Sequence, residues 1–203
     1  MKRLCLPLLL VCCLLLSACG SHAAEDRYSS FAQALSETDT LSFTAVLRAE
    51  YEDKTVDFTL RYDADTEGAV VTVLAPELVA GIKARVSGGS TALEYEGIII
   101  DTGRLDDYGL TPMSALPTLV EAMRGGHLES YWTEDNRAVF QLILDDHLYA
   151  VVYFESETMT PVRAELVSDG SVRVVCDIAG WGGAADTAVP NTTVPDTAEG
   201  TAE

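Results

Sequence analysis

The feature that most constrains the fold is a two-residue alternation of apolar and polar side chains along most of the chain. In one stretch, Phe43 and Leu47 alternate with Thr44 and Arg48. This period places the two sets on opposite faces of a strand. Polar turns separate successive stretches, and short connections join antiparallel neighbours. The predicted strands cover residues 41–51, 56–62, 69–74, 81–87, 91–96, 98–101, 128–133, 138–144, 148–155, 162–168 and 172–178.

Two segments have a helical period instead. The first follows a polar stretch at residues 21–26, and its apolar residues stand at i, i+3, i+4 and i+7. They are Tyr28, Phe31, Ala32 and Leu35. The second begins at Thr111, a good N-cap residue, and Pro112, which suits the first helical position. Pro117 interrupts its apolar stripe, which predicts a kink or two short helices.

These elements predict an α+β fold with one domain over residues 25–178. Many sequential strands in one sheet must curl or close. We therefore expect a single strongly curved antiparallel sheet, a half-barrel of about eleven strands. The N-terminal helix and the helical insertion would cover its concave face. Residues 179–203 are predicted to be a disordered acidic tail, with Trp181 as the only large apolar residue.

The first residues are typical of an export signal. Lys2 and Arg3 precede an apolar run at residues 4–16, and small residues follow it. This pattern predicts a signal peptide over residues 1–18. The run is shorter than the ~20 residues of a membrane-spanning helix.

The end of the signal, Leu16-Ser17-Ala18-Cys19, resembles the lipobox of bacterial lipoproteins. The resemblance implies a diacylglyceryl group on Cys19, cleavage before it and a lipidated tether over residues 19–24. Two acyl chains anchor a protein stably, whereas one does not. We expect an extracytoplasmic protein of the cell envelope, anchored to a membrane by this lipid.

Charge excludes some partners. The formal net charge is −19, and it becomes −21 when Lys2 and Arg3 leave with the signal. Nucleic-acid binding needs many cationic contacts, so it is not expected. Attraction to anionic lipid is not expected either, whereas a basic protein partner would fit. Cys176 lies on one face of a predicted strand, where we interpret it as a small buried hydrophobe.

The sequence carries no recognisable catalytic motif. It lacks an HExxH zinc motif, a GxSxG elbow, a P-loop and a dinucleotide fingerprint. The acidic pairs Asp106-Asp107 and Asp145-Asp146 could in principle bind Ca²⁺, but both stand in predicted turns, as does His147. We therefore expect neither an enzyme nor a resident metal or cofactor; a hydrolase is the remaining enzymatic alternative.

The order of elements over about 150 residues resembles the LolA/LolB superfamily of exported lipoprotein carriers and receptors. Two local stretches also fit: residues 76–82 followed by 93–97, and residues 157–161 leading to Asp169-Gly170. The resemblance implies a curved sheet that binds an acyl chain. The soluble carriers lack a lipid anchor, so a membrane-attached receptor or sensor fits this chain better than a shuttle.

Apolar side chains on strand faces and on the helical insertion could line such a pocket. The candidates are Phe43, Leu47, Phe58, Leu60, Met113, Leu116, Leu119, Val120, Met123, Phe140, Leu142, Tyr149 and Val151. Methionine suits a surface that accommodates varied shapes. The same residues could instead form a filled core. A further alternative is a protein–protein sensor or assembly factor at the extracytoplasmic membrane surface that uses this fold as a scaffold. In either case we expect a monomer.

Overall fold

The structure is a computed structural model that describes residues 21–50, 55–88, 90–103 and 110–182. In this part of the chain it confirms eleven strands and two longer helices, with one short 3₁₀ helix. The elements are α2 (Ser21–Ser36), β1 (Leu41–Glu50), β2 (Thr55–Asp65), β3 (Gly68–Ala75), η1 (Glu77–Val79), β4 (Lys83–Ser87), β5 (Ser90–Tyr95), β6 (Ile98–Gly103), α3 (Pro112–Gly125), β7 (His127–Glu134), β8 (Arg137–Ile143), β9 (Leu148–Glu155), β10 (Pro161–Ser168) and β11 (Ser171–Ala179).

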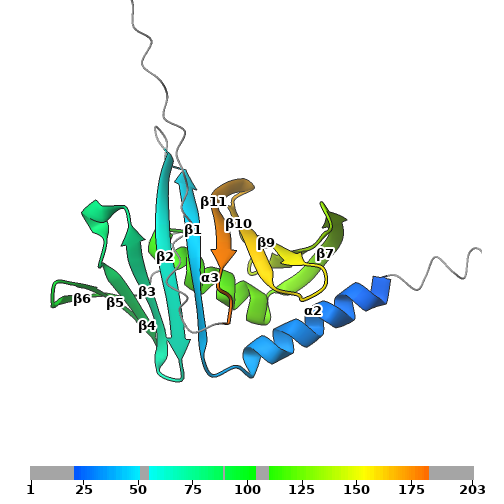
Figure 1. Ribbon diagram of the computed structural model, residues 1–203, viewed down its shortest axis with the longest axis horizontal. Coiled ribbons are helices and arrows are strands. Elements are labelled where there is room, and N and C mark those ends of the chain that lie inside the picture. Colours follow the sequence, from blue (N-terminus) through cyan, green and yellow to red (C-terminus); the bar gives the residue numbers. More distant parts are fainter. Residues whose placement is uncertain (1–20, 51–54, 89, 104–109, 183–203) are drawn as a thin grey trace, which may run out of the picture.

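All eleven strands form one antiparallel sheet in the order β6-β5-β4-β3-β2-β1-β11-β10-β9-β8-β7. The α+β class is therefore confirmed. The sheet is not strongly curled, so the expected half-barrel is wrong in this respect (Figure 1). Curling was expected because open sheets of more than about ten strands are rare. The two helices do cover the central part of one face.

Tight turns hold neighbouring strands antiparallel. In three hairpins both central residues have positive φ: Glu96-Gly97, Asp135-Asn136 and Asp169-Gly170. This geometry matches the twist of the strands that it joins. At the turn between β2 and β3, the Asp65 carboxylate accepts hydrogen bonds from the backbone N–H groups of Glu67 and Gly68. Asp in turns commonly does this.

Helix α2 has the predicted apolar stripe and buries Tyr28 and Leu35. It begins at Ser21, so residues 21–26 are helical and not the expected polar tether. The Tyr28 ring stacks on Phe140 with the centroids 5.1 Å apart, and its hydroxyl donates a hydrogen bond to the Met123 carbonyl. Burial raises the pKa of this hydroxyl, which therefore stays a donor.

Helix α3 packs on β3, β8, β9 and β10. Its start is confirmed: the Thr111 side chain accepts from the Ser114 N–H, and the Ser114 hydroxyl accepts from the Thr111 N–H. This is a capping box. The chain stays in one helix through Pro117, so the two short helices are wrong. Proline removes one backbone donor, and the tightly buried neighbours Leu116 and Leu119 hold the helix together.

The end of the domain lies beyond the predicted boundary at Ile178. Strand β11 continues to Ala179, and the Trp181 ring lies 4.9 Å from Phe43 and 6.3 Å from Phe31. The Gly182 N–H donates to the Ser42 carbonyl at 3.0 Å. The start of the predicted tail therefore packs on the domain. Residues 183–203 lie outside the described residues, as do the predicted signal peptide and Cys19.

Replacing this tryptophan tests the corrected boundary. We expect Trp181→Ala to lower the free energy of unfolding by about 2 kcal/mol, because a half-buried ring loses two aromatic neighbours. Trp132→Ala is the matched control, since Trp132 is 38% exposed on edge strand β7. Urea unfolding of both variants gives the comparison. Equal stabilities for the two variants would contradict docking of Trp181.

Candidate functional site

Most of the residues predicted to contact a ligand belong to the hydrophobic core. Nine are 0–3% exposed: Phe43, Leu47, Leu60, Leu116, Leu119, Val120, Met123, Phe140 and Leu142. Phe58 and Met113 pack against this core and are partly buried. The structure thus brings eleven of the thirteen together on the helix-bearing face, where they pack on one another.

Tyr149 and Val151 are exceptions, because they lie on the opposite face of the sheet. The register pairs Val152 with Phe140 and Ala150 with Leu142, so these residues share the helix-bearing face. Tyr149 and Val151 alternate with them. Both faces of β9 are apolar in sequence. The prediction took the face with the larger side chains, and that face points away from the helices.

One row of residues shows where the helix-bearing face becomes exposed. Directly paired positions run across six strands, from β1 to β6, through Phe43, Tyr62, Val71, Ala84, Leu93 and Ile100. Burial is nearly complete as far as Ala84, and Leu93 is partly buried. Ile100, at the edge, is 58% exposed. The helices therefore leave the last strands of this face uncovered.

Two neighbours extend this exposed surface. Ile98 is 65% exposed and Tyr95 is 43% exposed, and the two are paired across β5 and β6. Tyr95, Ile98 and Ile100 are called the inner patch below. Exposed apolar side chains in a contiguous group mark interaction sites, whereas isolated ones do not. The inner patch was missed in the sequence, although the run Ile98-Ile99-Ile100 is a signal for it.

Two acidic residues flank the isoleucine run of β6. Glu96 and Asp101 lie at the two ends of the isoleucine run, and both are exposed. On the other face, the Arg85 guanidinium bonds Glu94 at 2.7 Å, and this hydrogen bond lowers the pKa of the Glu94 carboxyl. An exposed carboxylate therefore stands near each end of the isoleucine run.

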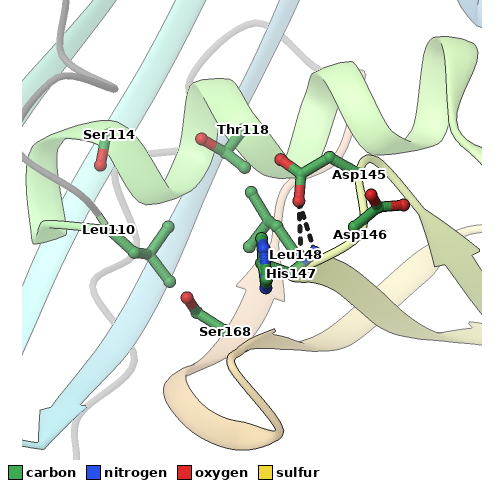
Figure 2. Close-up of a pocket in the computed structure, with 8 residues that line it drawn as sticks. All are labelled: Leu110, Ser114, Thr118, Asp145, Asp146, His147, Leu148 and Ser168. Carbon is green, nitrogen blue, oxygen red and sulfur yellow. Dashed lines mark hydrogen bonds between the residues drawn. The ribbon is translucent and has the colours of Figure 1, made fainter.

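The expected turn role of the Asp145-Asp146-His147 segment is confirmed for Asp145. Its carboxylate accepts hydrogen bonds from the backbone N–H groups of His147 and Leu148 (Figure 2). His147 is exposed and lies 3.2 Å from Asp169. The segment borders an open cavity of about 490 Å³ beside α3, lined by Leu110, Ser114, Thr118, Asp145, Asp146, His147, Leu148 and Ser168.

Two further features of the described residues bear on chemistry. Within the described residues, no group of three His, Cys, Asp or Glu side chains could hold a metal ion. Asp106-Asp107 lies outside those residues. Cys176 is buried, as expected, and burial raises the pKa of its thiol to about 12. A thiol of that pKa is not a nucleophile at neutral pH.

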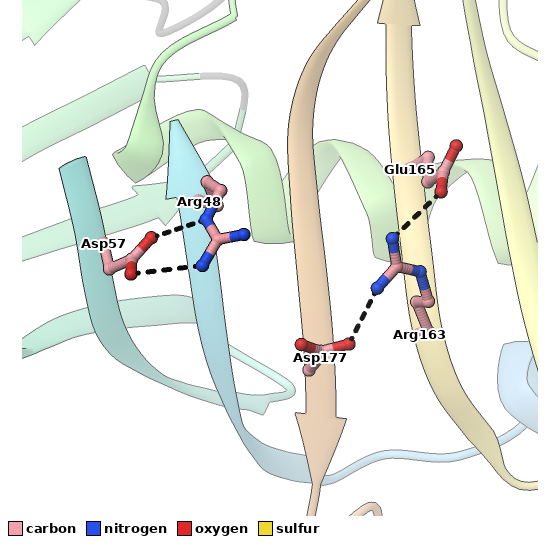
Figure 3. Close-up of polar contacts among 5 residues, drawn as sticks. All are labelled: Arg48, Asp57, Arg163, Glu165 and Asp177. Atoms are coloured by element: carbon pink, nitrogen blue, oxygen red, sulfur yellow. Dashed lines mark hydrogen bonds and ion pairs between the residues drawn. The ribbon is translucent and has the colours of Figure 1, made fainter. Parts of the chain in front are cut away.

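The opposite face of the sheet is largely a surface of ion pairs. Arg48 contacts Asp57 across β1 and β2, and Arg163 lies between Glu165 and Asp177 (Figure 3). The pairs Arg48–Asp57 and Arg163–Asp177 join neighbouring strands, whereas Arg163 and Glu165 both lie on β10. Exposed ion pairs of this kind suit a solvated face. Among the described helices, none is long and apolar enough to cross a membrane.

Comparison with known proteins finds structural similarity without sequence matches. No protein-family model and no curated protein matches the chain. A putative outer membrane lipoprotein-sorting protein domain from Vibrio parahaemolyticus is similar, with a TM-score of 0.48 and 12% identity over 81% of this chain and 96% of that chain. A LolA superfamily protein from Nitrosomonas europaea gives 0.42 and 12%, over 78% and 94% respectively.

Lipoprotein LppX of Mycobacterium tuberculosis is also similar, with a TM-score of 0.37 and 13% identity over 80% of this chain and 96% of that chain. The likeness to all three concerns the fold alone. The Nitrosomonas europaea protein is a member of the LolA superfamily, which the sequence of this chain also resembles.

Proposed function

We propose that the protein is an exported lipoprotein of the cell envelope that binds an acyl chain on its inner patch. The observation that carries this proposal is the exposure of Tyr95, Ile98 and Ile100 on the face whose central part is a closed core. The patch is apolar and extends that core to the surface. No catalytic step is assigned to it.

The size of the patch suits a reversible ligand. Burial of one large apolar side chain contributes about 1.5–3 kcal/mol when complete. Three partly exposed side chains would contribute about 3–5 kcal/mol before the entropic cost of binding. An acyl chain also contacts the neighbouring Leu93, which is partly buried. Weak, exchangeable binding is the expected result.

The test uses the alternation of side chains along β6, which places Ile98 and Ile100 on one face and Ile99 on the other. In Ile98→Ser/Ile100→Ser, the inner patch loses two side chains. In Ile99→Ser, a side chain of the same exposure, 64%, is lost from the opposite face. We expect the double variant to bind a fluorescent long-chain fatty acid about tenfold more weakly than the unaltered mature protein, a loss of about 1.4 kcal/mol. Ile99→Ser should bind it normally.

Native mass spectrometry of the purified protein with an excess of added fatty acid gives a second readout. A noncovalent adduct should form with the unaltered protein and Ile99→Ser, and it should be weaker or absent with the double variant. Absence of fatty-acid binding by the unaltered protein, or equal binding by all three proteins, would remove the proposal.

A further inference from the structure

We infer that the free edge of β6 accepts an extended segment of a partner protein, which adds a further strand to the sheet. The segment would alternate apolar and polar side chains and carry basic residues at its ends. This inference goes beyond acyl-chain binding, because it concerns the backbone edge and both faces of β6. Peptides commonly bind sheet edges in this way.

Position supplies the first argument. Strand β6 is the last strand in the sheet order and pairs only with β5. Among the described residues, no strand pairs with its other edge. The outward backbone N–H and C=O groups of an edge strand are a template for another chain.

The opposite edge of the sheet shows what a protected edge looks like. Strand β7 has a register shift between Leu128 and Ser130, and it carries the exposed carboxylates Glu129 and Glu134. Bulges and charges of this kind oppose edge pairing. Strand β6 also has a shift, opposite Thr91/Ala92, and an exposed Asp101, but both lie beyond the run Ile98-Ile99-Ile100. That run is regularly paired with β5 and 58–65% exposed, so the part of β6 that is suited to pairing is this run.

The exposure of Ile99 favours an added strand over a ligand that binds to only one face of the sheet. It ends a row of paired residues on the outer face, and the other five members are polar: Thr44, Arg61, Thr72, Lys83 and Glu94. An acyl chain on the inner patch would leave Ile99 in water. Side chains of an added strand alternate between both faces, so they would cover Ile99 as well as Ile98 and Ile100.

The negative charge near β6 favours a segment with basic ends. Glu96 and Asp101 flank the isoleucine run, and the chain as a whole carries a formal charge of −19. Basic ends on the added segment would pair with these carboxylates, whereas a second copy of this chain would bring the same negative charge.

A lipid on Cys19 would disfavour the membrane as occupant. Cys19 is two residues from Ser21, so the chain can separate the lipidated residue from the start of α2 by at most about 7 Å. Figure 1 shows that start and β6 at opposite ends of the molecule.

The probe is a pool of synthetic peptides with Val, Ile, Leu, Phe or Tyr at alternate positions, Thr between them and Lys or Arg at both ends. One control pool has Glu at both ends, and another is methylated on its backbone nitrogens. The protein is the mature lipidated chain in nanodiscs. Hydrogen exchange reports the amides of β6, and sedimentation reports the oligomeric state.

We expect the basic pool to slow exchange in β6 and to bind about tenfold more tightly than either control pool. Ile99→Lys should abolish this protection, whereas Val172→Lys, at a residue 41% exposed on β11, should not. Because Ile99 is outside the inner patch, Ile99→Lys should still bind the fatty acid, which separates this inference from the proposed function.

Three results would overturn the inference. The first is unchanged exchange in β6 with the basic pool, or equal binding of the methylated pool. The second is a dimer whose β6 amides are protected without peptide, which would make a second copy the occupant. The third is protection by lipid alone, seen as slower β6 exchange in nanodiscs than in detergent.

Discussion

Phe140→Ala is expected to lower the free energy of unfolding by about 4 kcal/mol, a large fraction of the stability of a domain of this size. Phe140 is 1% exposed, and its ring contacts Tyr28 of α2 and Phe154 of β9 at centroid distances of 5.1 and 5.5 Å. Truncation removes the side chain that joins the helix to the sheet. Thermal and urea unfolding measure the change.

Phe140→Leu is the matched control, because it keeps an apolar side chain of moderate size. We expect it to cost about 1 kcal/mol. The pair of variants also distinguishes a filled core from a ligand pocket around Phe140. In a filled core, stability falls with the volume removed. If Phe140 lined a ligand pocket, Phe140→Ala would retain its stability and lose fatty-acid binding, which would contradict the packed core.

Local pattern was sufficient to predict the strands, because neighbours in this sheet are mostly neighbours in sequence. Each hairpin needs only an alternating stretch and a turn residue that tolerates positive φ, as at Asp169-Gly170. The start of α3 was predictable for the same reason, since Thr111 and Ser114 cap it locally. Among the eleven described strands, only the pairing of β1 with β11 joins segments that are distant in sequence.

The candidate site was harder to predict, because burial depends on what covers a face. Alternation assigns Leu47 and Ile100 to the same face, but it does not show that one is fully buried and the other mostly exposed. That difference arises from where α3 ends along the sheet. Trp181 was misassigned for a related reason: its surroundings are polar in sequence, and its aromatic neighbours Phe31 and Phe43 are distant along the chain.

Membrane attachment should depend on the sulfur atom of Cys19. We expect Cys19→Ala to move the protein from the membrane fraction to the soluble extracytoplasmic fraction, or to stop its processing. The lipobox resemblance assigns the acyl chains to the Cys19 sulfur, and each buried CH₂ contributes about 0.8 kcal/mol. Loss of two chains removes far more binding energy than any surface substitution could.

The matched control for the anchor is Cys13→Ala, which removes a thiol from the same predicted signal peptide and should leave attachment unchanged. Fractionation with a carbonate wash, together with the mass of the mature protein, measures both. Full retention of Cys19→Ala in the membrane would place the anchor elsewhere. It would also remove the reason for orienting β6 away from the membrane, since that orientation follows from a lipid beside the start of α2. A soluble Cys19→Ala protein that still binds the fatty acid would instead show that anchoring and ligand binding are separate properties of the chain.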